Sequence, residues 1–234
     1  MKKIVVLAGE PEYGAQDSMR PIADLLASAL DVSIDYREPS VIADEPDFPE
    51  SSFGDLSTLS DADLLIIYTR FRRLIDADMV ALDSYLQGGG GVVGLRTSTH
   101  AFRFEPGSRW YSWNDSFGRD VLGSPWISHH GHSSSTDVAV LDDAPADLVQ
   151  GLPREFHVRS WLYRTELAGW AHPILSGNPV DPETQPDQGP VAWYGTPQGR
   201  RTFYTSLGHV EDLAEDAVRR LLVNAVAWTL GGRP

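Results

Sequence analysis

Residues 63–95 read DLLIIYTRFRRLIDADMVALDSYLQGGGGVVGL, and this stretch decides the fold. Asp63–Tyr68 and Val92–Leu95 are apolar runs of strand length. Asp76–Gln87 has the spacing of an amphipathic helix, with Asp76 as its N-cap and four consecutive glycines as its end. Strand, helix and strand in this order predict two parallel strands joined by a right-handed crossover.

The same alternation precedes this stretch. Lys3–Ala8 and Val32–Tyr36 predict two more buried strands. Met19–Leu30 predicts the helix between them, with Pro21 in its first turn, where proline is tolerated. We expect the Pro- and Asp-rich segment Glu38–Ser60 to be a long loop.

The second half of the chain is richer in strand signals. His172–Ile174 indicates a structural turn, and Glu211–Leu230 indicates a closing helix. No shift in composition marks a boundary, so residues 1–234 are predicted to form one domain. The expected fold class is α/β, a three-layer sandwich with helices on both faces of a central, mostly parallel sheet. The further strands are expected at Thr136–Leu141, His157–Thr165, Pro190–Tyr194 and Arg201–Thr205.

The composition excludes several classes of function. A formal net charge of −14 argues against nucleic-acid binding, which needs a basic surface. The absence of cysteine excludes disulfides, iron–sulfur clusters and a cysteine-nucleophile amidotransferase, so no glutaminase activity is expected. We find no apolar run that would span a bilayer and no apolar signal segment, so we expect a cytoplasmic protein without membrane contact. The sequence leaves open whether the protein is a homo-oligomer.

Polar side chains gather where the predicted parallel strands end. Ligands of open parallel sheets bind outside the carboxyl ends of the strands. Four loops begin at such ends, at Gly9, Thr69, Arg96 and Ser206. We therefore expect one site for a small molecule there. The polar residues at these ends are Glu10, Glu12, Tyr13, Arg70, Arg72, Arg73, Arg96, Thr97, Ser98, His100, His209, Glu211 and Asp212.

Gly90–His100 (GGVVGLRTSTH) has the layout of a nucleophile elbow, a buried strand that stops in a tight turn before a short helix. The turn position falls on Arg96 or Thr97. Arginine is no nucleophile, but its permanent charge and fork of donors suit an oxyanion. Alternatively, Arg96 pairs with a nearby carboxylate and only fixes the loop. The sequence leaves both interpretations open.

Ser128–His132 (SHHGH) holds three histidines within four positions. In an extended segment neighbouring side chains point to opposite faces, which predicts that His130 and His132 share a site while His129 faces away. Neutral imidazoles bind divalent metals such as zinc, so a metal at His130 and His132 is one hypothesis. The other is a polar loop whose histidines donate hydrogen bonds to a substrate or to the backbone.

Several segments resemble the trehalose-utilisation, ThuA-like family, in the right order and over most of the chain. The most specific is FYTSLGH at Phe203–His209. The resemblance implies a flavodoxin-like fold related to class I glutamine amidotransferases, and an association with sugar metabolism. Better-known members resemble Gly-Ile-His-Ser at the elbow, where this chain has Gly94-Leu95-Arg96-Thr97. The resemblance is carried by Gly90–Phe102, Phe117–Gly131, His172–Gly177 and Pro190–Trp228.

Two functions follow from the residues and the resemblance. The leading hypothesis is an enzyme that acts on a sugar or keto-sugar by hydrolysis or elimination. His100 and His209, with His130 or His132, would then supply acid–base or metal chemistry, and Arg96 would hold an oxyanion. Glu10 and Tyr13 would orient the substrate, and Arg70, Thr97, Ser98 and His130 would help to bind it. The alternative is a non-catalytic sugar- or anion-binding module on the same fold.

Overall fold

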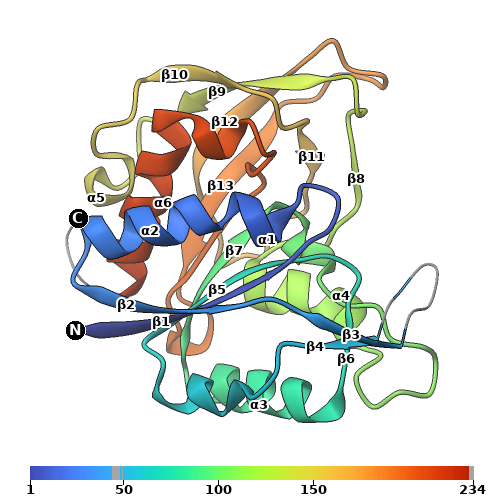
Figure 1. The fold of residues 1–234 in the computed structure, drawn as a ribbon. Coiled ribbons are helices and arrows are strands. Elements are labelled where there is room, and N and C mark those ends of the chain that lie inside the picture. The colour runs from blue at the N-terminus through green and yellow to red at the C-terminus, as the bar shows by residue number, and fades with distance from the viewer. Residues whose placement is uncertain (44–47, 49, 232–234) are drawn as a thin grey trace.

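The computed structural model of the protein describes residues 1–43, 48 and 50–231. A nine-stranded sheet lies at its centre, in the order β10-β9-β12-β13-β14-β7-β5-β1-β2, with helices against both faces (Figure 1). Its strands are β1 (Lys2–Gly9), β2 (Val32–Arg37), β5 (Leu64–Thr69), β7 (Gly91–Leu95), β9 (Ser135–Val140), β10 (Glu155–Val158), β12 (His172–Val180), β13 (Gly189–Gly195) and β14 (Thr202–Thr205).

The sheet has a parallel half and an antiparallel half. Strands β14, β7, β5, β1 and β2 are neighbours and run parallel to one another. Strands β13, β12, β9 and β10 continue the sheet in antiparallel pairs. The α/β fold class and the parallel strands predicted to begin near Lys3, Val32, Asp63 and Val92 are confirmed.

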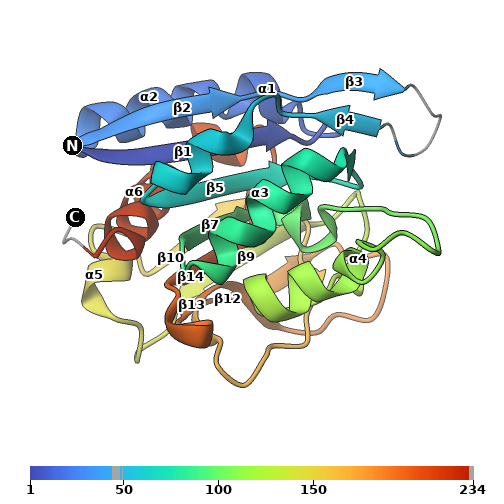
Figure 2. The same cartoon turned by 90° about the horizontal axis from the view of Figure 1, so that it is seen from below.

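Two helical layers cover the two faces of the sheet (Figure 2). Strand β1 shows why, because its side chains alternate between them. Ile4 and Val6 pack towards α2 (Arg20–Ala29), α5 (Ala146–Val149) and α6 (Asp216–Thr229). Val5 and Leu7 pack towards the other layer. That layer contains η1 (Leu56–Asp61), α3 (Asp76–Gln87), α4 (Trp113–Ser116) and the π-helix η3 (Phe117–Leu122). Within the described residues, no helix has the length and apolarity needed to cross a membrane.

Shorter elements complete the structure. The loop expected at Glu38–Ser60 is wrong in part, because strands and the helix η1 form within it, while residues 44–47 and 49 lie outside the described residues. Two small sheets consist of β3 (Ser40–Ala43), β4 (Glu50–Ser52) and β6 (Arg73–Leu74), and of β8 (Ser128–His129) with β11 (Tyr163–Arg164). The remaining helical turns are α1 (Ala15–Ser18), η2 (Arg96–His100), η4 (Pro197–Gly199) and η5 (Asp212–Ala214).

Two expectations for the second half are corrected. The turn expected at His172–Ile174 is the start of β12. Pro173 is tolerated there because the register of β12 against β13 shifts just after it, and bulges accept proline. The single strand expected over His157–Thr165 is broken, because β10 ends at Val158 and β11 begins at Tyr163.

Candidate functional site

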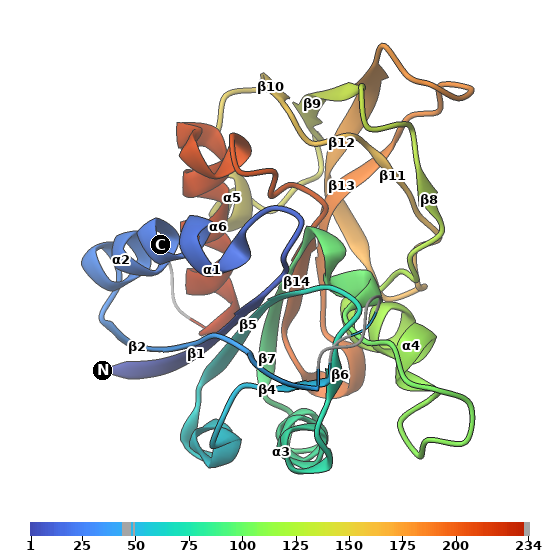
Figure 3. The ribbon, with the colours of Figure 1, turned by 45° about the vertical axis from the view of Figure 1, so that its right-hand side comes forward.

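The loops that follow β1, β5, β7 and β14 leave the sheet at the same edge (Figure 3). These four strands are parallel neighbours in the order β14-β7-β5-β1, so their carboxyl ends lie side by side. The candidate residues at the ends of these strands are therefore brought together by the fold itself.

The elbow begins at Arg96, where β7 turns directly into η2. Its φ of 41° lies in the left-handed region, which residues other than glycine rarely adopt. Two hydroxyls fix the turn on β5: Thr97 Oγ1 donates to the carbonyl of Thr69 over 2.9 Å, and Ser98 Oγ donates to that of Ile67 over 2.7 Å. Both side chains are buried, so their expected binding of a substrate stays a prediction.

Gly118 on η3 allows the elbow to pack closely. A Cβ atom at Gly118 would lie 2.3 Å from the carbonyl oxygen of Thr99 and 2.9 Å from that of Ser124. Backbone atoms cannot yield as a flexible side chain can. We therefore expect Gly118→Ala to lower the free energy of unfolding by about 2 to 3 kcal/mol in urea denaturation. Gly169→Ala is the control, because nothing lies within 4 Å of its Cβ position. Equal stability of the two variants would contradict this packing.

The guanidinium of Arg96 is fully buried in a box of aromatic rings. Its centre lies 4.6 Å from the ring centroid of Tyr13, 4.5 Å from that of Trp161 and 5.0 Å from that of Tyr163. Nη1 donates to the carbonyl of Ser206 over 2.8 Å, and Nη2 donates to the Tyr13 hydroxyl over 3.1 Å. Nε is buried, and no described residue accepts a hydrogen bond from it. We call Arg96, Tyr13, Trp161 and Tyr163 the arginine box.

No carboxylate of the described residues forms an ion pair with Arg96, so the alternative in which a carboxylate fixes it is wrong. The faces of the three aromatic rings attract the Arg96 charge, and this attraction replaces part of the hydration that the guanidinium loses on burial. Because the interior screens poorly, the charge is felt beyond the box. It helps to lower the pKa values of His100, His129 and His209, where burial is the larger cause. A negative charge that develops on a ligand nearby would be stabilised for the same reason.

Glu10 carries a buried carboxyl group that contacts the backbone of Tyr13. Its oxygens accept hydrogen bonds from the backbone N–H groups of Glu12, over 2.8 Å, and Tyr13, over 2.6 Å. Burial raises the pKa of Glu10 from 4.5 to about 7, although the two hydrogen bonds act in the opposite direction. At neutral pH such a group both accepts and donates a proton, which suits a general base or acid better than the orienting role expected from the sequence.

His209 stands at the edge of the arginine box. Its ring centroid lies 5.7 Å from that of Tyr13 and 6.2 Å from that of Trp161. Burial lowers the pKa of His209, while the charge of Asp212 opposes this shift. The imidazole is therefore neutral at physiological pH, and 16% of its side chain is exposed, so it can accept a proton from a ligand.

His100 is buried among three aromatic rings, one of which is Tyr163 of the arginine box. Its centroid lies 6.3 Å from that of Tyr163, 4.9 Å from that of Phe71 and 5.0 Å from that of Trp126. Burial lowers the pKa of His100 to about 3. Such an imidazole has no proton to give at neutral pH and is a weak base, which fits a hydrogen-bonding role better than acid–base catalysis. The catalytic role expected of His100 stays a prediction.

The histidines of Ser128–His132 are arranged differently from the expectation. His129 and His132 lie together, with ring centroids 4.5 Å apart, and both contact Trp161. His130 is buried elsewhere, with Nδ1 3.5 Å from the Thr184 hydroxyl. The prediction that His130 and His132 share a face is wrong because β8 ends at His129 and Gly131, with φ 113°, turns the chain.

This arrangement also bears on the expected metal. Among the described residues, no group of three or more His, Cys, Asp or Glu side chains could hold a metal ion. His132 Nε2 does lie 3.9 Å from Glu12 Oε1. A divalent metal such as zinc stays a prediction, which metal analysis of the purified protein tests.

Arg70 is held by Glu12 rather than free for a ligand. Its Nε lies 3.1 Å from Glu12 Oε2, and its guanidinium lies 4.9 Å from the ring centroid of Phe71. About a third of each partner is exposed, at 34% for Arg70 and 31% for Glu12, so a ligand can still compete for the pair. Its predicted role in binding stays open to experiment.

Sequence analysis missed several residues of the site. Trp161 and Tyr163 contribute two walls of the arginine box, and Tyr68 donates its hydroxyl to the carbonyl of Gly208 over 2.7 Å. Tyr68 ends a buried strand, so it does not stand out by residue type. Asp212, which the sequence placed beside His209, lies beneath the turn that carries this histidine. The cluster of Trp161 and Tyr163 was a usable signal, hidden by its assignment to a regular strand.

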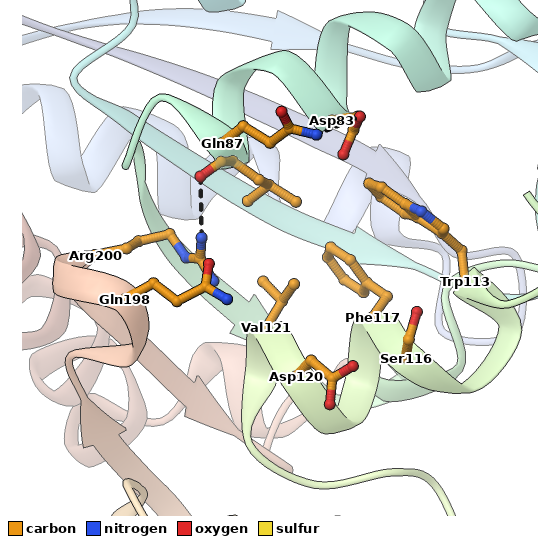
Figure 4. A pocket seen from close by; sticks show the side chains of 10 residues that line it. Asp83, Gln87, Trp113, Ser116, Phe117, Asp120, Val121, Gln198 and Arg200 are labelled. Carbon is orange, nitrogen blue, oxygen red and sulfur yellow. Dashed lines mark hydrogen bonds between the residues drawn. The ribbon is translucent and has the colours of Figure 1, made fainter.

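A separate hollow of about 180 Å³ lies at the opposite edge of the sheet, between the last turn of α3 and the η3 helix (Figure 4). Gln198 and Arg200, which precede β14, also line it, whereas none of the residues nominated from the sequence does. Nη1 of Arg200 donates to the carbonyl of Leu86 over 3.0 Å, which ties this arginine to the end of α3. Arg200 is therefore a buried arginine with a structural partner, and it lies before β14, away from the carboxyl ends of the parallel strands.

The fold first defines a class, an α/β protein with a mixed sheet between helical layers and an elbow after β7 that carries arginine. Within this class, the ThuA family, described as trehalose utilisation, matches residues 4–229, and the chain belongs to that family. The resemblance predicted from the sequence is confirmed. No curated protein matches the chain.

Solved structures share the fold at low sequence identity. A ThuA-like protein from Bacteroides uniformis is 17% identical with a TM-score of 0.68, over 100% of this chain and 94% of its own. One from Parabacteroides merdae is 16% identical with a TM-score of 0.69, over 99% of this chain and 91% of its own. Agd3, described as a carbohydrate deacetylase, is 12% identical with a TM-score of 0.54, and 98% of this chain matches 32% of it.

Proposed function

We propose that the protein is an enzyme of carbohydrate metabolism that acts on a sugar or keto-sugar by hydrolysis or elimination at the arginine box. The observation that carries the proposal is that Tyr13 contacts two buried groups, because its backbone N–H donates to the Glu10 carboxyl and its hydroxyl accepts from Arg96. The Glu10 carboxyl has a pKa of about 7, and the Arg96 guanidinium is buried without a carboxylate partner among the described residues. Both reactions need a proton-transfer group and a fixed positive charge, and the loops after β1 and β7 supply one of each at the same edge of the sheet.

The chemistry assigns each group a role. In elimination, the Glu10 carboxylate takes the proton next to a keto group, and the field of Arg96 stabilises the negative charge that moves to the keto oxygen. The leaving oxygen departs with its bonding electrons as the double bond forms, and takes up the proton that Glu10 has just accepted. In hydrolysis, the protonated Glu10 gives its proton to the leaving oxygen while water adds to the carbon. Neutral His209 accepts the proton of that water.

A sugar substrate is supported by two further features. Trp126 is 40% exposed beside His100 and offers an amphipathic face on which a sugar ring can stack. The trehalose-utilisation description of the family and the carbohydrate deacetylase of similar fold both agree with this class of ligand.

A non-catalytic binding module is the second candidate. It is favoured by the complete burial of Glu10, which keeps this carboxyl from direct contact with solvent, and by the low pKa of His100, which leaves its imidazole without a proton to give at neutral pH. Such a module would use the arginine box as a fixed electrostatic floor and would leave Glu10 as a structural cap of the Glu12–Tyr13 turn.

Thermal stabilisation by a panel of neutral sugars, keto-sugars and sugar acids, followed by product analysis, separates these candidates. A ligand at 100 times its Kd stabilises the folded state by about 2.7 kcal/mol. We expect a sugar or keto-sugar to stabilise the protein and to be converted, and Glu10→Gln to keep binding but lose conversion. Stabilisation without any product would favour the binding module. No stabilisation and no product across the panel would contradict a sugar ligand.

A further inference from the structure

The carboxylate of Asp212 is buried, with 1% of the residue exposed, and is surrounded by donors rather than by a cation. Oδ1 accepts hydrogen bonds from the backbone N–H groups of Arg159, over 2.7 Å, and Ser160, over 3.2 Å. Oδ2 accepts from the Ser160 hydroxyl and from the N–H of Gly208, over 3.3 Å. A carboxylate has enough lone pairs for all four donors, whereas an amide has only one acceptor oxygen.

These donors come from two segments that are far apart in the sequence. Arg159 and Ser160 lie in the loop between β10 and β11, just before Trp161. Gly208 lies in the turn after β14, with φ 145°, just before His209. The Ser160 hydroxyl adds a direct link, because it accepts the backbone N–H of His209 over 3.1 Å. Asp212 and Ser160 thus join the loop that carries a wall of the arginine box to the turn that carries its histidine.

The charge of Asp212 also acts on the His209 ring. The charged groups around this imidazole are Asp212 and Glu211 on its own segment, Arg96 from the elbow and Arg159 from the β10–β11 loop. Tyr13 and Trp161 face it with their rings. Glu211 Oε1 lies 3.9 Å from His209 Nδ1, but the Glu211 side chain is 69% exposed and therefore screened by water. Asp212 is the negative charge that the solvent does not screen.

We infer that Asp212 is a positioning residue of the candidate site, which fixes the turn that carries His209 against the loop that carries Trp161. The assignment of these two residues to a working site rests on the proposed function. The positioning itself rests on the four hydrogen bonds and on the link through Ser160. An acidic residue is needed here because one side chain accepts hydrogen bonds from backbone N–H groups of two separate segments.

The test compares three variants by NMR titration of the His209 ring and by amide hydrogen exchange. Asp212→Asn removes the charge and strands buried N–H groups, so the His209 pKa is expected to fall further by roughly one unit. Exchange at Ser160 and Gly208 is expected to become about tenfold faster or more. Ser160→Ala keeps the charge, so it is expected to speed exchange at His209 and to leave the His209 pKa within a few tenths of a unit.

Glu211→Gln is the matched control, because it removes a carboxylate that is close to His209 but makes none of these hydrogen bonds. It is expected to change the pKa less than Asp212→Asn and to leave the exchange rates as they are. A His209 pKa that rises or stays constant in Asp212→Asn would overturn the inference, as would unchanged exchange at Ser160 and Gly208. Neither readout needs a ligand. If no sugar binds while both readouts change as expected, the proposed function fails and the positioning role stands.

Discussion

An Arg96→Met variant is expected to fold, to show raised pKa values for His129 and His209, and to lose turnover. Burial is the larger cause of both lowered pKa values, but the Arg96 charge adds to it, so its removal moves the pKa values of His129 and His209 back towards the ordinary value. If the same charge stabilises an oxyanion, kcat is expected to fall by about 10²- to 10³-fold, the usual effect of removing such a group. NMR titration measures the first effect without any substrate.

The variant should remain folded because two effects on stability oppose each other. Methionine leaves the Ser206 carbonyl and the Tyr13 hydroxyl without the donor they have in the native protein, which costs about 1 to 3 kcal/mol. It also removes a buried charge and fits among aromatic rings, which offsets part of that cost. Urea denaturation should therefore show a cooperative transition at lower denaturant concentration.

Arg200→Met provides the matched control. Arg200 is also buried, at 3% exposure, and also donates to a backbone carbonyl, but it lies at the opposite edge of the sheet. We expect a similar loss of stability with no change in the histidine pKa values or in turnover. Equal effects of the two substitutions on His129 and His209 would show that Arg96 acts through general destabilisation, and would contradict its electrostatic role.

The fold was predictable where burial is uniform. Strands β1, β5 and β7 are buried on both faces and read as continuous apolar runs. Helix α3 has the bounds predicted for it, but its N-cap is Ile75 and not the predicted Asp76. The errors fall where local chemistry is ambiguous. β12 begins His-Pro, a pair that indicates a turn, and only its neighbours in the sheet make it a strand. β3 and β4 form an antiparallel pair within a segment that its proline and aspartate content marks as a loop.

The candidate site was predictable to the level of its loops but not of its side chains. Parallel strands place their carboxyl ends at one edge whatever the loops contain, so Glu10, Arg96 and His209 were found from the order of elements. The orientations of His129 and His130 depend on a two-residue strand and a glycine turn, which alternation alone cannot give. Two walls of the arginine box, Trp161 and Tyr163, lie 65 and 67 residues beyond Arg96 in the sequence, and only tertiary packing brings them to it.

Glu10→Gln is expected to have the second large effect, on both stability and catalysis. The pKa of Glu10 is raised from 4.5 to about 7 by burial. Below pH 4.5 both the folded and the unfolded chain hold this proton, so the contribution is at its most favourable. Between pH 4.5 and 7 the unfolded chain loses the proton while the folded protein keeps it, so the free energy of unfolding falls as the pH rises. Above pH 7 both forms are ionised and the fall ends, at about 3 kcal/mol in total.

Glutamine cannot titrate, so this fall should be absent from Glu10→Gln. Relative to the native protein, the variant should gain about 3 kcal/mol between pH 4.5 and 7.5, measured by urea denaturation at each pH. The N–H groups of Glu12 and Tyr13 donate to different oxygens of Glu10, whereas glutamine has only one acceptor oxygen. One N–H group therefore loses its acceptor, and the variant starts from a lower stability at acid pH. If Glu10 is the proton-transfer group, kcat should fall by about 10²- to 10⁴-fold and the pH–rate profile should lose its limb near pH 7.

Asp78→Asn separates the effect of a buried carboxyl on stability from its effect on catalysis. Asp78 is a buried carboxyl in the outer layer at α3, where it accepts the N–H of Phe53 over 2.7 Å and the Ser52 hydroxyl over 3.2 Å. Burial raises its pKa too, so its removal should also flatten part of the pH dependence of stability. Because Asp78 lies away from the arginine box, turnover should keep its native pH profile. A Glu10→Gln enzyme with native kcat and an unshifted profile would remove Glu10 from the chemistry, whatever its effect on stability.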